Sequence, residues 1–190
     1  NAGSDLASLR TRADRDGDEY VINGQKIWTS MAMDANMIYV LARTDRNAKK
    51  QEGISFFLVP MDTPGIEVRP LVTIDLNDEF AEVFFDNVRV PAANLVGQPN
   101  KGWSMAKDLL GFERVFLGAP KQAGYALGRV RDIADRMGAA GDEGVAETAA
   151  RHRMDAADLA DLYETFLDEM RAGEVPGPDV SMLKVLQTEL

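Results

Sequence analysis

Residues 79–103 read EFAEVFFDNVRVPAANLVGQPNKGW, and the character of the chain changes within this stretch. Glu79–Val90 has the composition of a β-strand, which Asp86-Asn87 interrupts and Val90-Pro91 closes. A polar connector follows over residues 94–101, and a helical pattern begins near Gly102. The sequence therefore predicts a β half before this stretch and an α half after it, which is an α+β fold.

The residues before this stretch form short strand-like runs with turn signals between them. Met37–Arg43, Gly53–Pro60 and Ile66–Pro70 have strand length and show no helical pattern. The polar run 14–18 and Asn23-Gly24 predict turns, and the second of these suits a two-residue hairpin. Strands at such short intervals predict an all-β barrel or sandwich.

The residues after this stretch are expected to be helical. We expect three helices, at Gly102–Met137, Val145–Ala172 and Asp179–Leu190. Pro120 should kink the first of them, because proline frees the carbonyl four residues earlier. The expected domains are therefore a β domain at residues 1–98 and the start of a helical bundle at residues 99–190.

Composition excludes several classes of function. The chain has 190 residues and a net charge of -10, which argues against binding a phosphate backbone as its main task. It has no Cys, so it has no disulfide, thiolate nucleophile or Cys-ligated metal. Its one histidine, His152, lies between two arginines and is expected at the surface. We expect no metal site, no nucleic-acid partner and no membrane span.

The N-terminal residues do not resemble a natural start. Asn1–Asp5 contains no Met and no signal peptide. The chain is therefore expected to be an internal piece of a larger protein, with any targeting signal outside it and a cytoplasmic location.

Glu113 interrupts the apolar stripe of the first expected helix. The stripe consists of Ala106, Leu109, Leu110, Phe116, Leu117, Pro120, Gly124 and Leu127. A carboxylate among apolar side chains is desolvated, which makes it a stronger base and suits it to proton abstraction. The alternative is a structural ion pair with an Arg or Lys elsewhere in the fold.

Two short segments near the N-terminus suit a nucleotide cofactor. Gly3-Ser4 forms a small-residue turn whose amides and hydroxyl suit a phosphate. Trp28-Thr29-Ser30 ends a predicted strand and places an aromatic plane beside hydroxyl donors, which suits a planar heterocycle. The alternatives are an ordinary turn and a tryptophan of the core.

The order and spacing of these segments and of Gly111–Val115 resemble the acyl-CoA dehydrogenase family. The resemblance also rests on Gly53–Pro60, Pro64–Ile66, Phe84–Gly97 and Gly102-Trp103, in the family's order. It is nearest to bacterial members related to pimeloyl-CoA dehydrogenase.

The resemblance implies an FAD-dependent oxidation of the Cα–Cβ bond of an acyl-CoA, as in fatty acid metabolism. It places Gly3 and Ser4 at the FAD pyrophosphate. It places Trp28, Thr29 and Ser30 at the flavin ring, with Thr29 near N5. Donors fixed at this point stabilise the electron density that the flavin gains on reduction.

The resemblance leaves the catalytic base open between two positions. Most family members carry a glutamate late in the helical domain, beyond Leu190, whereas one branch carries it on a bundle helix just before an Arg. Glu113-Arg114 matches the second pattern. Arg114 is then expected to contact CoA, and the alternative is a solvated or ion-paired Arg. Arg136-Met137-Gly138 departs from the family's Arg-x-x-Phe-Gly segment, which contacts FAD across a subunit interface.

The same resemblance implies an electron-transfer flavoprotein as the electron acceptor and assembly into a homo- or hetero-oligomer. Glycines at positions 111, 118, 124 and 128 favour close helix packing in such an assembly. Two other functions remain open on this fold. One is a flavin oxidase or hydroxylase, and the other is a non-catalytic partner subunit of a hetero-oligomer.

Overall fold

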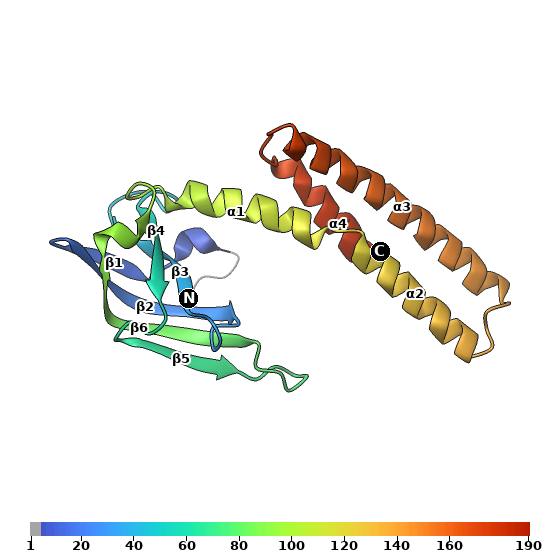
Figure 1. The fold of residues 1–190 in the computed structure, drawn as a ribbon, viewed down its shortest axis with the longest axis horizontal. Helices are drawn as coiled ribbons and strands as arrows, with labels where there is room; N and C mark the ends of the chain where they lie inside the picture. The colour runs from blue at the N-terminus through green and yellow to red at the C-terminus, as the bar shows by residue number, and fades with distance from the viewer. Residues whose placement is uncertain (1–4) are drawn as a thin grey trace. The chain divides into compact units, whose positions relative to one another are not determined.

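The computed structural model describes residues 5–190 and divides the chain into two compact units, residues 1–106 and 107–190. All strands belong to the first unit, and three of the four α-helices lie in the second (Figure 1). The predicted β half followed by an α half is confirmed.

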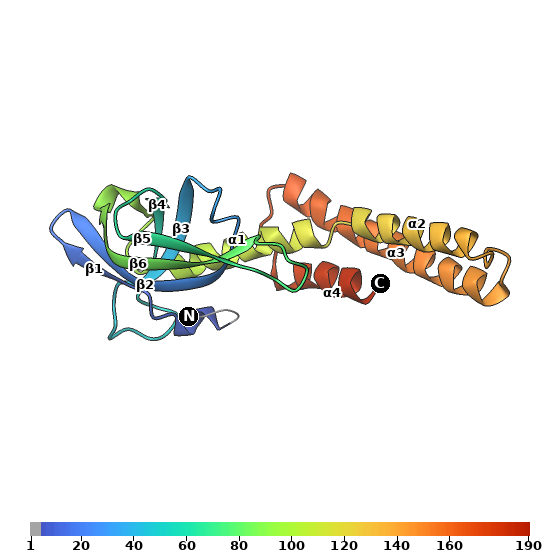
Figure 2. The ribbon, with the colours of Figure 1, turned by 90° about the horizontal axis from the view of Figure 1, so that it is seen from below.

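The first unit contains one seven-stranded sheet. Its strands are β1 (Arg12–Asp16), β2 (Glu19–Ser30), β3 (Met37–Arg43), β4 (Ile54–Pro60), β5 (Ile66–Leu71), β6 (Phe80–Pro91) and β7 (Leu95–Val96). Their order is β5-β6-β2-β1-β3-β4-β7, and Figure 2 shows β5, β6 and β2 side by side. Among the described residues β5 and β7 do not pair with each other, so the all-β unit is an open sheet and not a closed barrel.

Side chains that alternate along the strands build the main core. In β6 the buried positions are Ala81, Val83, Phe85, Val88 and Val90. They pack with Ile22, Val40 and Val59 from other strands, and the rings of Tyr20 and Phe57 meet edge to face at 4.9 Å. Burial of this apolar surface at about 25 cal/mol per Å² is the main force that holds the sheet together.

The hairpin predicted at Asn23-Gly24 is wrong. Strand β2 runs through these residues, and the tight turn lies at residues 17–18, where Asp16 pairs with Glu19 and Gly17 has φ +63°. Gly24 instead marks a register shift between β2 and β6. A Cβ on Gly24 would lie 2.7 Å from Cα of Thr11, so close backbone approach and a φ of +143° require glycine here.

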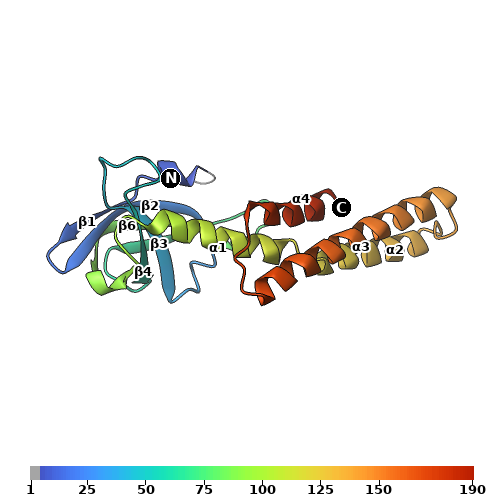
Figure 3. The same cartoon turned by 90° about the horizontal axis from the view of Figure 1, so that it is seen from above.

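The helical unit differs from the prediction at its first helix. The helices are α1 (Gly102–Leu117), α2 (Lys121–Arg136), α3 (Glu143–Arg171) and α4 (Ser181–Glu189). The expected helix over Gly102–Met137 is therefore two helices with a break at residues 118–120. Pro120 takes the N-cap position of α2 instead of kinking a continuous helix. Figures 1 and 3 show α2 and α3 side by side.

Gly118 explains the close packing at this break. A Cβ on Gly118 would collide with Cβ of Leu183 in α4. Leu183 is fully buried in the core of this unit together with Val115, Ala123, Leu159, Phe166 and Val180. The close packing expected from the glycines is therefore present at Gly118, whereas Gly124 and Gly128 meet nothing within 4 Å among the described residues.

The first turns of α1 pack with the sheet. Ala106 is buried against Leu9, Leu41 and Ile54, and a Cβ on Gly102 would lie 2.8 Å from the carbonyl carbon of Ser55. These contacts explain why the first unit extends to Ala106.

Candidate functional site

The end of β2 holds an exposed tryptophan in an unusual backbone conformation. Trp28 has φ +62° and its side chain is 60% exposed. The pairing of β2 with β6 shifts between Lys26 and Thr29, so Trp28 occupies a bulge. Its ring meets Phe80 edge to face at 6.0 Å. This tryptophan is therefore presented to solvent by a rigid strand, and the prediction of a core tryptophan does not describe it.

A second residue with positive φ closes the segment. Met31 has φ +55°, and its amide donates a hydrogen bond of 2.7 Å to the carbonyl of Glu79. Between Trp28 and Met31, the ladder places Thr29 opposite Ala81 and Ser30 opposite Phe80. Non-glycine residues in this region cost about 1 to 3 kcal/mol each and gather at functional sites. The structure thus brings Trp28, Thr29 and Ser30 together on one short, fixed segment.

Lys26 lies two residues before Trp28 and has its side chain in the sheet unit's interior. It stands opposite the buried Val83, and its Nζ donates a hydrogen bond of 2.7 Å to the carbonyl of Leu41 in β3. Burial lowers the pKa of Lys26 from 10.5 to about 8. The sequence analysis missed this residue, although its inward position in the strand's alternation was the available signal.

We expect the stability of the sheet unit to rise with pH above about 8. The folded chain then releases the Lys26 proton while the unfolded chain keeps it up to about 10.5, so the unfolded state binds more protons in this window. The free energy of unfolding should increase by up to about 3 kcal/mol between pH 7.5 and 10.5. Urea unfolding of the wild type and of Lys26→Met, compared across this range, measures the effect. An equal slope in both proteins would contradict it.

Arg43 organises the segment that precedes β1. Its guanidinium donates to the carbonyls of Ala7 at 2.9 Å and Leu9 at 3.4 Å, and also to those of Lys50 and Glu52 at 3.0 and 3.1 Å. Arg43 therefore ties the 3-10 turn Leu6–Ser8 to the loop before β4. The predicted phosphate-binding residues Gly3 and Ser4 lie outside the described residues.

Glu113 and Arg114 are neighbours on α1 in the helical unit. Glu113 is exposed, and Arg114 is partly buried. The side chains of the predicted apolar stripe do not share one environment. Ala106 is buried, whereas Leu109, Leu110, Phe116 and Leu117 are exposed. The described residues therefore do not desolvate Glu113, and they give it no ion-pair partner.

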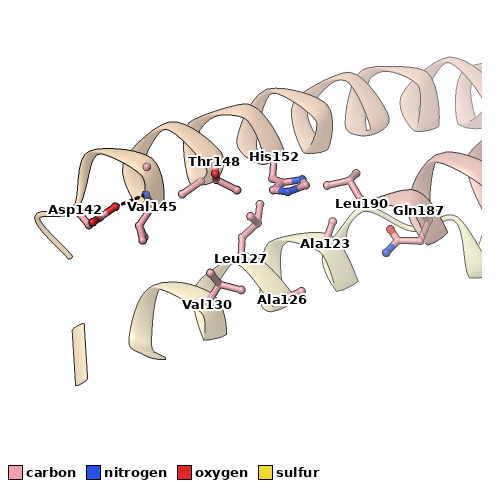
Figure 4. Close-up of a pocket in the computed structure, with 12 residues that line it drawn as sticks. Ala123, Ala126, Leu127, Val130, Asp142, Val145, Thr148, His152, Gln187 and Leu190 are labelled. Atoms are coloured by element: carbon pink, nitrogen blue, oxygen red, sulfur yellow. Dashed lines mark hydrogen bonds between the residues drawn. The ribbon is translucent and has the colours of Figure 1, made fainter. Parts of the chain in front are cut away.

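A cavity of the helical unit has a volume of about 740 Å³ and lies between α2, α3 and α4 (Figure 4). Leu127, Val130 and Val145 give it an apolar lining. Nδ1 of His152 and Oε1 of Gln187 are buried at its edge without hydrogen-bond partners among the described residues. His152 Nδ1 lies 3.8 Å from a carboxylate oxygen of Asp155, which is three residues further along α3, and this distance is too long for a hydrogen bond.

Two kinds of site are absent from the described part of the chain. Residues 5–190 contain no cluster of His, Asp and Glu suited to hold a metal ion. None of the helices at these positions combines the length and the apolar character that crossing a bilayer requires.

Comparison with known proteins agrees with this architecture. Residues 1–88 match the family model "Acyl-CoA dehydrogenase, middle domain". The chain is 45% identical over 152 residues to acyl-CoA dehydrogenase IpdE1 of Mycobacterium tuberculosis, an alignment that covers 79% of this chain and 40% of IpdE1.

Solved structures show the same similarity over both units. The steroid ACAD Tcur3481-Tcur3483 superposes with a TM-score of 0.88 at 35% identity and covers 99% of this chain and 49% of that one. The ChsE4-ChsE5 complex from Mycobacterium tuberculosis gives a TM-score of 0.82 at 36% identity, covering 99% and 50%.

The chain spans about half the length of these structures and 40% of IpdE1. The superposed region covers 99% of this chain, so it includes the sheet and the helices that follow. The chain belongs to the acyl-CoA dehydrogenase family, and its N-terminal part is a middle β domain of that family.

Proposed function

We propose that the full-length protein binds FAD and oxidises the Cα–Cβ bond of an acyl-CoA thioester. The observation that carries this proposal is the end of β2, where a 60% exposed Trp28 is fixed beside Thr29 and Ser30 in a family that uses acyl-CoA dehydrogenation. In this proposal residues 1–98 form the middle β domain and residues 99–190 begin the helical domain.

The residues of this chain would bind and orient the cofactor. Trp28 would pack on the flavin ring, while the hydroxyls of Thr29 and Ser30 donate to its polar edge, and Gly3 and Ser4 would hold the pyrophosphate. FAD, when bound, supplies the acceptor for the hydride that leaves Cβ. Donors that are fixed before the reaction lower its barrier because they need no reorganisation.

Glu113 would remove the proton from Cα. Its carboxylate accepts that proton as the Cα–H bond breaks, which makes it the general base. Arg114, the next residue, would contact the CoA moiety. Since Glu113 is exposed in the described chain, its desolvation would come from the bound acyl group and from surfaces that cover α1 in the full-length protein.

The visible spectrum of the purified full-length protein tests the proposal. We expect a bound flavin that bleaches when acyl-CoA is added without oxygen. The acyl-CoAs should include short, long and ring-bearing acyl groups, because one relative is titled a steroid ACAD. A full-length protein that does not bind FAD would refute the proposal. Electron transfer to an electron-transfer flavoprotein, measured after bleaching, tests the proposed acceptor.

A non-catalytic subunit of a hetero-oligomer is the second candidate function. The similarity to the ChsE4-ChsE5 complex supports assembly with another subunit, whereas the retention of Trp28-Thr29-Ser30 and Glu113 argues against a loss of catalysis. In that case the purified protein carries no flavin that acyl-CoA reduces, and activity returns only with another subunit. An oxidase or hydroxylase on this fold would instead consume oxygen after the flavin is reduced.

The two hydroxyls of the β2 segment should have unequal effects on the flavin. We expect Thr29→Ala to shift the flavin reduction potential while the midpoint of thermal unfolding stays within about 2 °C, because a surface change usually costs less than about 0.5 kcal/mol. Ser30→Ala is the matched variant, one residue away on the same strand. A larger shift with Ser30→Ala would assign the contact near N5 to Ser30 instead of Thr29.

We propose that the protein assembles through its helical unit and that α2 lies at the interface. Among the described residues nothing lies within 4 Å of a Cβ added at Gly124 or Gly128. Gly→Ala inside a helix stabilises it by about 1 kcal/mol per position. We expect the double variant to raise the unfolding free energy of this chain and to weaken the full-length oligomer by crowding the interface.

Light scattering and urea unfolding together measure the two effects. Thr165→Ala, at an exposed position of α3, is the control because it also improves helix propensity. An oligomer of unchanged mass and concentration dependence in Gly124→Ala/Gly128→Ala would exclude α2 from the interface.

A further inference from the structure

Lys26 is a buried amine that the proposed reaction does not use. Its Nζ crosses from β2 to the carbonyl of Leu41 in β3 at 2.7 Å. No ion pair joins Lys26 to a carboxylate anywhere in residues 5–190, and burial alone is the cause of its lowered pKa. An enclosed charge is costly unless it is hydrogen-bonded, and the Leu41 carbonyl is the partner that Lys26 has.

The strand order shows where this contact lies. Strand β1 stands between β2 and β3, but its pairing with β2 reaches only to Asn23, opposite Arg12. At the same position Arg12 pairs with Arg43 of β3. Beyond it, residues 24–26 and 29–30 of β2 pair with β6 on one side, and no strand of residues 5–190 pairs with them on the other. This unpaired half of β2 is the part that ends in Trp28, Thr29 and Ser30.

The side chains of Thr11 and Lys26 connect this unpaired half of β2 to β3. Oγ1 of Thr11 donates to the carbonyl of Gln25 at 3.0 Å, and the carbonyl of Thr11 accepts from the amide of Arg43 at 2.8 Å. Lys26 makes the second bridge, one residue further along β2 and two residues from Trp28. Thr11 is 1% exposed, so water does not replace either bridge without opening the core.

We propose that Lys26 is a positioning residue that fixes the end of β2 relative to β3 and so sets the geometry in which Trp28, Thr29 and Ser30 hold the flavin. The inference rests on the proposed function, since it assigns to Lys26 the alignment of that same cofactor site. Lys26 acts through the backbone of β2 and does not touch the cofactor.

This role has a distinct dependence on pH. An ammonium and a neutral amine both carry N–H groups that donate to the Leu41 carbonyl, so the bridge persists when Lys26 loses its proton. The wild-type flavin reduction potential should therefore change between pH 7 and 9 only as the flavin's own protonation requires. A charge acting directly on the flavin would instead weaken as Lys26 titrates at about 8.

The experiment compares full-length Lys26→Met, Lys26→Arg and wild type, after wild type has been shown to bind FAD. Lys26→Met keeps the aliphatic stem and removes the donor. We expect it to slow flavin reduction by acyl-CoA by up to about 10²-fold and to shift the visible flavin spectrum, because small misplacements of reacting groups have effects of this size. Lys26→Arg keeps a donor and should restore most of the rate. Lys49→Met, at an exposed lysine of the same unit, is the control.

Thr11→Val gives a second and independent variant. It removes the other bridge at nearly constant volume and should move the same flavin spectrum in the same direction, so it decides the matter if Lys26→Met does not fold. Wild-type flavin properties in both Lys26→Met and Thr11→Val would overturn the inference. The inference would also be overturned if the wild-type flavin reduction potential changed its pH dependence near pH 8, because Lys26 would then act on the flavin through its charge. Absence of FAD from the wild type refutes the proposed function instead.

Discussion

Glu113→Gln in the full-length protein should slow reduction of the bound flavin by acyl-CoA by about 10² to 10⁴-fold, the usual contribution of a general base. Gln has nearly the same shape and cannot accept the Cα proton. The variant should keep its FAD and its midpoint of unfolding, since Glu113 is exposed and makes no ion pair among the described residues. Rapid-mixing absorbance at the flavin band measures the rate.

Asp108→Asn is the matched control for this experiment, because Asp108 is an exposed carboxylate on the same helix α1. It should leave the rate of flavin reduction unchanged. A wild-type rate in Glu113→Gln would show that Glu113 is not the base and would move that role to a glutamate beyond Leu190.

Gly118→Ala should lower the free energy of unfolding of the helical unit by about 1 to 3 kcal/mol, the usual cost of overpacking. The added methyl group would collide with Cβ of the fully buried Leu183, and neither backbone can retreat without opening the core around Leu159 and Phe166. Gly124→Ala makes the same chemical change where nothing lies within 4 Å among the described residues, and it should stabilise α2 by about 1 kcal/mol.

Chemical unfolding followed by the helical circular dichroism signal compares these two variants. The opposite signs are the essential result, because the same Gly→Ala change is made at a crowded position in one variant and at an open position in the other. A stabilised Gly118→Ala would show that α4 does not pack against the break between α1 and α2.

Local sequence patterns predicted four of the seven described strands with bounds close to those observed. Met37–Arg43 was predicted with its observed bounds, and Ile54–Pro60 with an error of one residue. Both are apolar runs of strand length between polar loops. Such runs are typical of buried strands, and strands are what the structure has at these positions. The order of the strands was not predictable in this way, because pairing joins residues that lie far apart in the chain.

The errors arose where contacts between distant residues decide the local structure. Asn23-Gly24 has the sequence of a turn, but Thr11 packs against the backbone of Gly24 and keeps β2 extended. The break after α1 was expected as a kink at Pro120, and it begins at Gly118 because Leu183 occupies the space of a side chain. Neither partner is visible in the local pattern.

The candidate site was predictable in part. An aromatic residue beside two hydroxyls at a predicted strand end indicated Trp28, Thr29 and Ser30. The structure places them at the end of β2 with Trp28 exposed, and their role in binding a cofactor stays a prediction. The positive φ of Trp28 and Met31 was not predictable, because neither residue type favours that conformation. Arg43 and Lys26 were missed since they act on backbone carbonyls of distant segments, and only the inward position of Lys26 in the strand's alternation gave a local signal.

The open sheet ends in the strands β5 and β7, and both are poor templates for another strand. Strand β7 has only two residues. Strand β5 carries Pro70, which has no N–H to donate, and a charged pair in which Arg69 lies 2.7 Å from Glu67. Short strands, proline and charge are the features by which natural sheets prevent edge-to-edge aggregation. Both terminal strands therefore resist pairing with a strand from another molecule, and the proposed assembly through the helical unit needs no contribution from them.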